Sequence, residues 1–195
     1  MAYVRWTIRI LFFAFVVAFL HYTLPQRDLV RVADTEIIRK DYSGWTRIFY
    51  AQPDTGDLEQ PTRDLRLINT VRGNGRVSVY RNEDTGFGWP PYFKLDSANL
   101  QAEAADAVST REAPEWYMIR HYGWRSPFLS IYPNGITIKP AAGPKWSDHP
   151  WYVQVPWFNL AVILFLIAVY WAIAVRVKRF RENRIDPLFA DDDEV

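Results

Sequence analysis

Two Asp-Thr-Gly tripeptides, at 54–56 and 84–86, are the first residues of this 195-residue sequence that suggest chemistry. Aspartic proteases use this tripeptide to supply two carboxylates that share one proton. In those enzymes each Asp ends an apolar strand, whereas here Gln-Pro precedes Asp54 and Asn-Glu precedes Asp84. Because Asp and Gly are strong turn formers, we interpret both tripeptides as turns and predict no catalytic residue from them.

The histidines supply the other candidate acid–base groups. A hydrolase acting at a membrane face would pair Asp54 or Asp84 with His121 or His149, and the two side chains must lie within hydrogen-bond reach across one pocket. A lone His in a strand is more often a hydrogen-bonded structural residue. We therefore keep the hydrolase as an alternative and predict no catalytic residue.

The sequence has no Cys, which excludes thiol catalysis and Cys-based zinc sites. We expect no metal site and no cofactor.

Aromatic residues provide the candidate binding residues. They make up 16% of the chain and include nine Trp, a composition typical of surfaces that contact other molecules. The candidates are Trp89, Tyr92, His121, Trp124 and Arg125. They would contact a protein partner or, as an alternative, stack against a small ligand or a lipid. The net charge of +1 excludes a polycation built for nucleic acid, so no nucleic-acid partner is predicted.

Two apolar segments predict membrane helices. Residues 157–175 carry no formal charge and, at ~1.5 Å per residue, are long enough for a hydrocarbon core of ~30 Å. A second helix over 4–24 contains the apolar run 10–20 and can span if Arg9 reaches the headgroups. A cleaved signal is the alternative for this segment. The following residues, HYTLPQ, lack a small-x-small cleavage site, which favours an uncleaved anchor.

Basic residues predict the orientation of both helices. Arg5 and Arg9 precede the first, and five Lys or Arg follow the second within residues 176–185. Both flanks are then cytoplasmic and the segment between them lies on the other side of the bilayer. From the N-terminus, the predicted organisation is an anchor at 1–24, a domain at 25–156, a helix at 157–175, and a basic then acidic cytoplasmic tail at 176–195.

The segment between the helices predicts a compact, mainly-β (α+β) domain with one packed helix, as a small barrel or sandwich. Alternating apolar and polar residues predict half-buried strands over 28–50, 64–71 and 76–82, the last two joined as a hairpin by Gly-Asn-Gly at 73–75. Further strand patterns lie in 116–124 and 128–140, with a turn or bulge at Asn134-Gly135.

The helix is predicted over 97–108. Its apolar stripe, Leu100, Ala104 and Val108, is expected to pack on strands such as 76–80 and 128–132. Its other face, Gln101, Glu103 and Asp106, is expected to stay in water.

Three blocks carry a resemblance to a known family. HYTLPQ at 21–26, NEDTGFGWPPYFKLDSANLQAEA at 82–104 and HYGWRSPFLSIYPN at 121–134 resemble the bacterial family called domain of unknown function 1523. The resemblance implies a bacterial inner-membrane protein with its central domain in the periplasm, and brings no activity or catalytic residues. The leading hypothesis is a non-enzymatic protein whose periplasmic domain binds a membrane or periplasmic protein, as an accessory subunit of an envelope complex.

Overall fold

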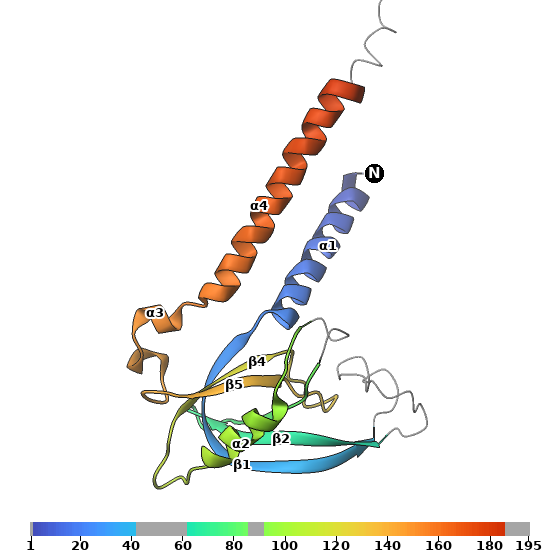
Figure 1. Ribbon diagram of the computed structural model, residues 1–195. Helices are drawn as coiled ribbons and strands as arrows, with labels where there is room; N and C mark the ends of the chain where they lie inside the picture. Colours follow the sequence, from blue (N-terminus) through green and yellow to red (C-terminus); the bar gives the residue numbers. More distant parts are fainter. Residues whose placement is uncertain (1, 42–61, 86–91, 186–195) are drawn as a thin grey trace, which may run out of the picture. The chain divides into compact units, whose positions relative to one another are not determined.

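The structure is a computed structural model that describes residues 2–41, 62–85 and 92–185. It contains two compact units, Met1–Trp151 and Tyr152–Val195. The first unit consists of helix α1 (Ala2–Thr23), which leads directly into a β-domain (Figure 1). The long helix of the second unit is α4 (Trp157–Phe180), and a π-helical turn over Arg181–Ile185 follows it.

Five strands close into a barrel. They are β1 (Gln26–Asp41), β2 (Thr62–Arg72), β3 (Val77–Arg81), β4 (Tyr117–Tyr122) and β5 (Asn134–Pro140). The order around the barrel is β1-β2-β3-β5-β4, and the neighbours are antiparallel except for a short parallel contact between β3 and β5. Strand β1 contributes to the closure with two different stretches, since residues 26–30 pair with β4 and residues 30–41 pair with β2. The predicted mainly-β domain is therefore confirmed as a barrel.

The predicted hairpin forms between β2 and β3. The turn is closed by a hydrogen bond from the Arg72 backbone N–H to the Arg76 carbonyl, 2.8 Å long. Gly75 has a φ of 81°, a left-handed conformation that glycine adopts without steric cost. Ile68 then faces Tyr80 across the two strands, and both side chains are fully buried.

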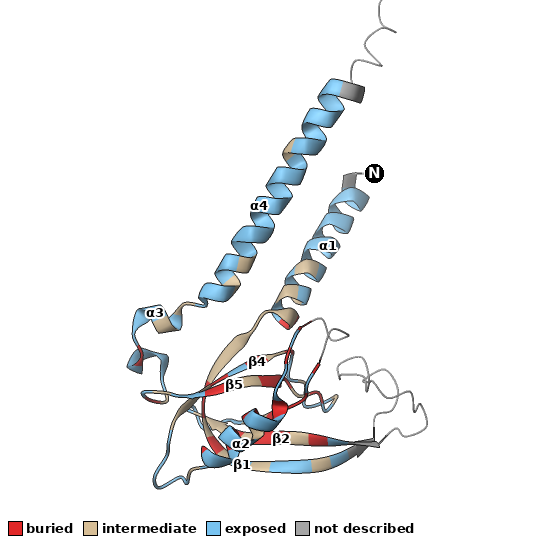
Figure 2. Ribbon diagram, in the orientation of Figure 1, coloured by how far each residue is buried: buried red, intermediate tan, exposed pale blue. Residues whose placement is uncertain are grey.

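The hydrophobic core lies between the strands and helix α2 (Ser97–Asp106), where the buried residues gather in Figure 2. Its members are Val30, Val32, Ile68, Tyr80, Leu100, Ala104, Ala107, Ile119 and Ile138. Asp96 caps the helix by accepting a hydrogen bond from the Asn99 backbone N–H, 3.3 Å long. As predicted, Leu100 and Ala104 are buried while Glu103 and Asp106 are exposed.

Two details of the helix prediction are wrong. The helix ends at Asp106, and Ala107 has left helical geometry with a ψ of 0°. Ala107 is therefore the buried residue, and Val108 is 44% exposed. Gln101 is half-buried because its side-chain oxygen accepts a hydrogen bond from Asn82, 2.9 Å long.

Residues 128–132 also differ from their prediction. Instead of a strand, this part of the chain belongs to a turn closed by paired backbone hydrogen bonds between Ser126 and Ile131. Helix α2 consequently lies against β5, β1 and β2. A bulge does interrupt the pairing of β4 with β5, opposite the step from Arg120 to His121 and next to Gly135.

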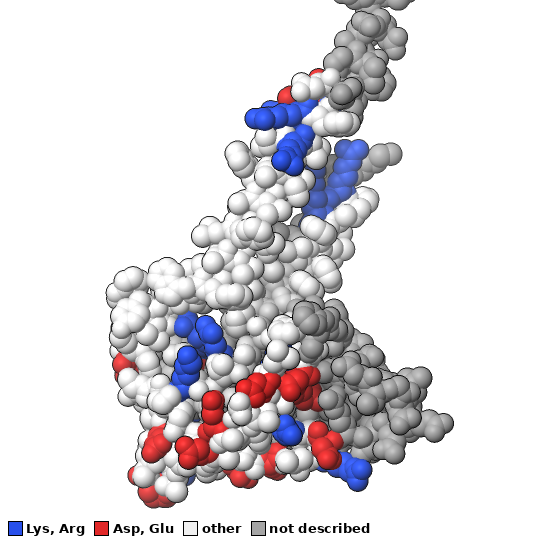
Figure 3. Space-filling view, viewed as in Figure 1, with Lys and Arg blue, Asp and Glu red and all other residues white. Residues whose placement is uncertain are grey.

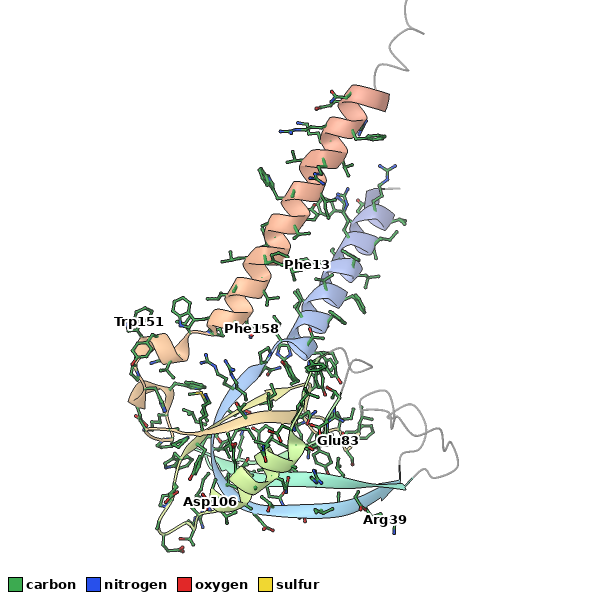
Figure 4. All side chains as sticks on the ribbon, viewed as in Figure 1. Phe13, Arg39, Glu83, Asp106, Trp151 and Phe158 are labelled. Atoms are coloured by element: carbon green, nitrogen blue, oxygen red, sulfur yellow. The ribbon has the colours of Figure 1, made fainter. Side chains whose placement is uncertain are left out.

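Helices α1 and α4 are both long and apolar enough to cross a membrane. In the most apolar stretches of Tyr3–Thr23 and Trp157–Asn183 no residue is buried within the structure. Side chains such as Phe13 and Phe158 project away from their helices (Figure 4). Helix α4 continues past the predicted end at 175, through Lys178 and Arg179, to Phe180.

Replacing the core side chain of α2 should destabilise the barrel. We expect Leu100→Ala to lower the free energy of unfolding by about 2–5 kcal/mol, because burial is lost and a cavity remains. The matched change on the exposed face, Glu103→Ala, should cost less than about 0.5 kcal/mol. Urea denaturation of the detergent-solubilised chain measures both values. Equal effects would mean that this face of α2 does not pack on the strands.

Candidate functional site

A charged side chain is buried at the end of β3, on the face of the strand opposite to that of the core residue Tyr80. The side chain of Arg81 is 1% exposed. Its Nη1 lies 3.3 Å from Oε2 of Glu83, and its Nη2 donates a 2.6 Å hydrogen bond to the Tyr92 hydroxyl. Removing a charge from water costs several kcal/mol unless partners replace the water. Glu83 and Tyr92 therefore orient the guanidinium. Glu83 lies on the segment that leaves β3 (Figure 4).

Lys94 is a second buried cation, 2% exposed. Its ammonium donates a hydrogen bond to Oδ1 of Asn82. Backbone and side-chain bonds with Thr85 hold it inward: the Thr85 N–H donates to the Lys94 carbonyl, 3.1 Å, and the Lys94 N–H donates to the Thr85 hydroxyl, 3.0 Å. Burial lowers the pKa of Lys94 to about 7, against the opposing attraction of Asp84 and Glu83.

The Asp of the second Asp-Thr-Gly tripeptide binds Ser97, the first residue of helix α2. One oxygen of Asp84 accepts from the Ser97 backbone N–H at 2.9 Å, and the other accepts from the Ser97 hydroxyl at 3.0 Å. Arg66 also donates to that hydroxyl, at 3.1 Å. A carboxylate at the start of α2 is stabilised by unsatisfied N–H groups and by the helix dipole. We call Arg66, Arg81, Asn82, Glu83, Asp84, Lys94 and Ser97 the Lys94 cluster.

His121 is paired with an aspartate that the sequence did not single out. Its Nε2 lies 3.1 Å from Oδ2 of Asp28, which also accepts 2.6 Å hydrogen bonds from the Tyr80 hydroxyl and from Arg72 Nη2. Burial acts to raise the pKa of Asp28, but the hydrogen bonds from His121 and Tyr80, with the charge of Arg72, outweigh it and hold the pKa below its usual value. Asp28 is therefore an ionised structural anchor for three donors.

The hydrolase pairs are not formed among the residues that the structure describes. Asp84 contacts Ser97, His121 contacts Asp28, and His149 accepts from the Ala142 backbone N–H at 3.2 Å. Asp54 lies outside the described residues. Within 2–41, 62–85 and 92–185, no three His, Asp or Glu side chains gather as metal ligands.

Aromatic rings join the end of α1 to the barrel. The Tyr92 ring stacks on Tyr122 with centroids 4.5 Å apart and lies 5.8 Å from Tyr22. Trp124 meets Tyr22 edge-on at 5.3 Å, and its indole N–H donates to Nδ1 of His21, 2.9 Å. We call these five residues the aromatic junction. Such ring pairs add about 0.5–1.5 kcal/mol beyond their burial.

A glycine provides the backbone conformation that follows β4 at the junction. The Gly123 N–H donates to the Tyr22 carbonyl at 3.0 Å, so α1 is tied to β4 through the backbone as well. Gly123 has a φ of 81°, which an L side chain rarely adopts. A Cβ there would meet the Tyr22 ring at an ordinary contact distance of 3.5 Å, so the backbone conformation, and not a lack of space, favours glycine.

The predicted binding residues do not form one site. Tyr92 and Trp124 belong to the aromatic junction, and His121 lies inside the barrel against Asp28. Arg125 lies over the Tyr132 ring, 4.5 Å from its centroid, and donates to the Ile131 carbonyl. Trp89 lies outside the described residues. Their role in binding a ligand or a protein stays a prediction.

The family model described as "Protein of unknown function (DUF1523)" matches residues 1–181. The chain belongs to the DUF1523 family. An uncharacterised protein of Haemophilus influenzae is 36% identical to it over 156 residues, which is 80% of this chain and 84% of that relative. No solved structure matches the DUF1523 chain. The sequence resemblance is confirmed, and these comparisons assign no activity.

Sequence reasoning missed the buried charges of this DUF1523 protein. Phe93 and Leu95 are 44% and 61% exposed, whereas Lys94 between them is buried. The alternation of apolar and charged residues is visible in the sequence, but its usual interpretation places the apolar residues inside. Contacts with Asn82 and Thr85, which the sequence does not reveal, place Lys94 inside the domain instead.

The lowered pKa of Lys94 predicts a pH dependence of stability. The unfolded chain binds a proton at this lysine up to a pH near 10.5, whereas the folded chain releases it near 7. Between these values the unfolded state holds more protons, so the contribution of Lys94 to stability is least favourable below pH 7 and improves as the pH rises.

We therefore expect the free energy of unfolding to rise from pH 6 to pH 9 more steeply in the wild type than in Lys94→Met. Lys139→Met, at an exposed position of β5, is the control and should keep the wild-type slope. Urea denaturation across this pH range measures the slopes. A wild-type slope in Lys94→Met would contradict the assignment.

Proposed function

We propose that this DUF1523 protein is a bacterial inner-membrane protein whose barrel lies in the periplasm and binds a protein partner, as an accessory subunit of an envelope complex. The observation that carries the proposal is that the buried and half-buried ionisable side chains of the domain bind one another or neighbouring polar groups. Asp28 anchors three donors, Arg81 contacts Glu83 and Tyr92, and Lys94 is bonded to Asn82. Networks of this kind build a rigid interior.

The contacts of the candidate acid–base residues favour binding over hydrolysis. A hydrolase needs a base that can reach a nucleophile or water within a substrate pocket. Asp84 is occupied at the start of α2, and His121 is held between Asp28 and the Tyr80 ring, whose centroid lies 5.1 Å away. These groups are positioned to support the fold.

The aromatic junction supports a role in which helix α1 holds the barrel in a fixed position, where a partner can bind it. Tyr22 and His21 belong to the last turn of α1, and their contacts with Trp124 and Tyr92 connect that helix to the barrel. A membrane helix joined in this way would fix the orientation of the domain at the bilayer surface. The same rings are the aromatic residues that would otherwise be available to stack a ligand.

The lipid bilayer is the first partner in this proposal. Two exposed apolar helices of this length suit the hydrocarbon core. Arg5 and Arg9 at the start of α1, and the basic residues after 175, favour cytoplasmic termini by the positive-inside rule.

A reporter fusion tests the orientation. We expect a reporter that is active only in the periplasm to be active when inserted within residues 54–59 and silent when fused after Val195. Immunoblotting of both fusions controls for their amounts. The reverse pattern of activity would overturn the proposed topology.

Protein binding by the barrel is tested by crosslinking in membranes, followed by extraction in mild detergent and affinity purification. We expect the full chain to recover a defined partner in stoichiometric amount. A matched chain in which residues 26–150 are replaced by a flexible linker should lose that partner while keeping both apolar helices. Recovery of the full chain alone under several detergents and crosslinkers would contradict the proposal, as would equal recovery by the matched chain.

A further inference from the structure

The second half of β1 has one strand edge that no described strand covers. Strand β4 pairs only with Gln26–Val30 at the start of β1, whereas β2 pairs with β1 as far as Asp41. A bulge between Val32 and Asp34 interrupts the pairing with β2. Beyond this bulge, β1 has a paired strand on one side only among the residues that the structure describes. We call residues 34–39 the β1 edge.

The register shows which backbone groups of the β1 edge point outward. Ile37 is opposite Arg66, and the Arg66 carbonyl accepts a 2.9 Å hydrogen bond from the Asn82 N–H on the other side of β2. Opposed residues of an antiparallel pair alternate between those that exchange both backbone bonds and those that exchange none. Ile37 and Arg66 are of the second kind. The N–H and carbonyl of Ile37 therefore point away from β2, as do those of Arg39 two residues later.

The β1 edge is closed at its start and open farther along. Oδ1 of Asp34 accepts a 2.8 Å hydrogen bond from the Thr35 backbone N–H. Within the described residues, no backbone hydrogen bond outside the strand ladder reaches Ile37 or Arg39. Ile37 is 63% exposed, and Arg39 lies near the tip of the β1–β2 pair and points away from the barrel (Figure 4). An exposed edge of this kind is a template on which another extended chain can add as a strand.

The charges of the β1 edge are sorted along the strand. Asp34 and Glu36 come first and Arg39 comes last, and all three are exposed. Acidic and basic atoms both lie along this lower side of the domain in Figure 3. Opposite charges placed directly across two strands stabilise the pair, and like charges weaken it. An antiparallel strand therefore fits when a basic residue lies opposite Glu36 and an acidic residue lies opposite Arg39, with an apolar residue opposite Ile37.

The position of the β1 edge distinguishes between its possible occupants. In Figure 1 the second half of β1 lies on the side of β2 away from α1, so the bilayer of the proposed topology does not reach it. Two copies that paired their β1 edges would be related by a two-fold axis perpendicular to the sheet. That rotation would direct the second α1 to the opposite side, which two chains anchored in one membrane cannot satisfy.

We infer that the β1 edge binds an extended segment of the envelope partner, which adds as an antiparallel strand with a basic residue opposite Glu36 and an acidic residue opposite Arg39. The inference rests on the proposed function and adds the surface and the class of partner segment. Main-chain hydrogen bonds to Ile37 and Arg39 supply the affinity. The sorted charges set the direction and the register of the incoming strand.

A synthetic peptide tests the β1 edge directly. The fluorescein-labelled peptide Glu-Val-Val-Lys-Thr-Lys, with blocked ends, places its Glu opposite Arg39, its second Val opposite Ile37 and its first Lys opposite Glu36. We expect fluorescence anisotropy to show that it binds the detergent-solubilised full chain. N-methylation of the second Val, whose N–H would bond to Ile37, should weaken binding by about tenfold or more. The matched control is N-methylation of the first Val, whose N–H faces away from β1, and it should keep the affinity.

The charges are tested with the peptide Lys-Val-Val-Glu-Thr-Glu, which places like charges opposite Arg39 and Glu36. We expect it to bind more weakly than the first peptide. Equal binding of the two N-methylated peptides would overturn the inference, as would equal binding of the two charge patterns. Failure of the first peptide to bind the wild-type chain would overturn it as well. None of these measurements needs a variant of the chain.

A proline in the β1 edge provides the matching change in the protein. Ile37→Pro removes an outward N–H and no bond to β2, which is the position at which edge strands accept proline. It should abolish binding of the first peptide, whereas the matched control Ile37→Thr keeps the N–H and should bind it. Thermal melting in detergent checks the fold of both variants. Binding of the peptide by folded Ile37→Pro with wild-type affinity would contradict the inference.

Two further measurements separate the other outcomes. A dimer of the wild type in native mass spectrometry that becomes a monomer in Ile37→Pro would assign the edge to a second copy and overturn the inference. In affinity purification from crosslinked membranes, a partner that Ile37→Pro recovers as well as the wild type contradicts only this inference. A wild-type chain that recovers no partner contradicts the proposed function and the inference together.

Discussion

A guanidinium removed from water needs polar partners on several sides. Arg81 has two such partners, and they come from different segments of the chain. Glu83, two residues along the chain, lies 3.3 Å from it, and Tyr92 accepts a 2.6 Å hydrogen bond. The Arg81 backbone N–H also donates to the Pro133 carbonyl, which places the end of β3 beside the start of β5. The burial of one charge thus fixes the chain on both sides of the barrel closure.

Tyr92 connects the buried Arg81 to the end of α1. Its hydroxyl is held by Arg81, and its ring is packed between Tyr122 and Tyr22. Tyr22 in turn contacts Trp124 and accepts from Gly123. The buried Arg81 at the end of β3, the end of β4 and the last turn of α1 therefore form one connected set of contacts. This connection gives the proposed partner-binding role its physical basis.

The barrel could be predicted to a large extent because its local signals agree with one another. The alternating runs around Gly-Asn-Gly lead to the β2–β3 hairpin, and the stripe of Leu100 and Ala104 leads to the buried face of α2. The end of that helix could not be placed, because Ala107 and Val108 are both apolar and only the packing decides which is buried. The partners of the buried charges could not be predicted from the sequence either. Asp28 and His121 are far apart in sequence, and their contact depends on the register between β1 and β4.

The central claim, that the end of α1 and the barrel are one structural unit, is tested most directly by hydrogen exchange at the Gly123 amide in the detergent-solubilised full chain. Its hydrogen bond to the Tyr22 carbonyl exists only while α1 is joined to the barrel. We expect this amide to exchange as slowly as the Arg81 amide, which is bonded within the barrel closure. Exchange as fast as at Ser130, in the exposed turn before β5, would mean that α1 and the barrel separate freely and would contradict the account.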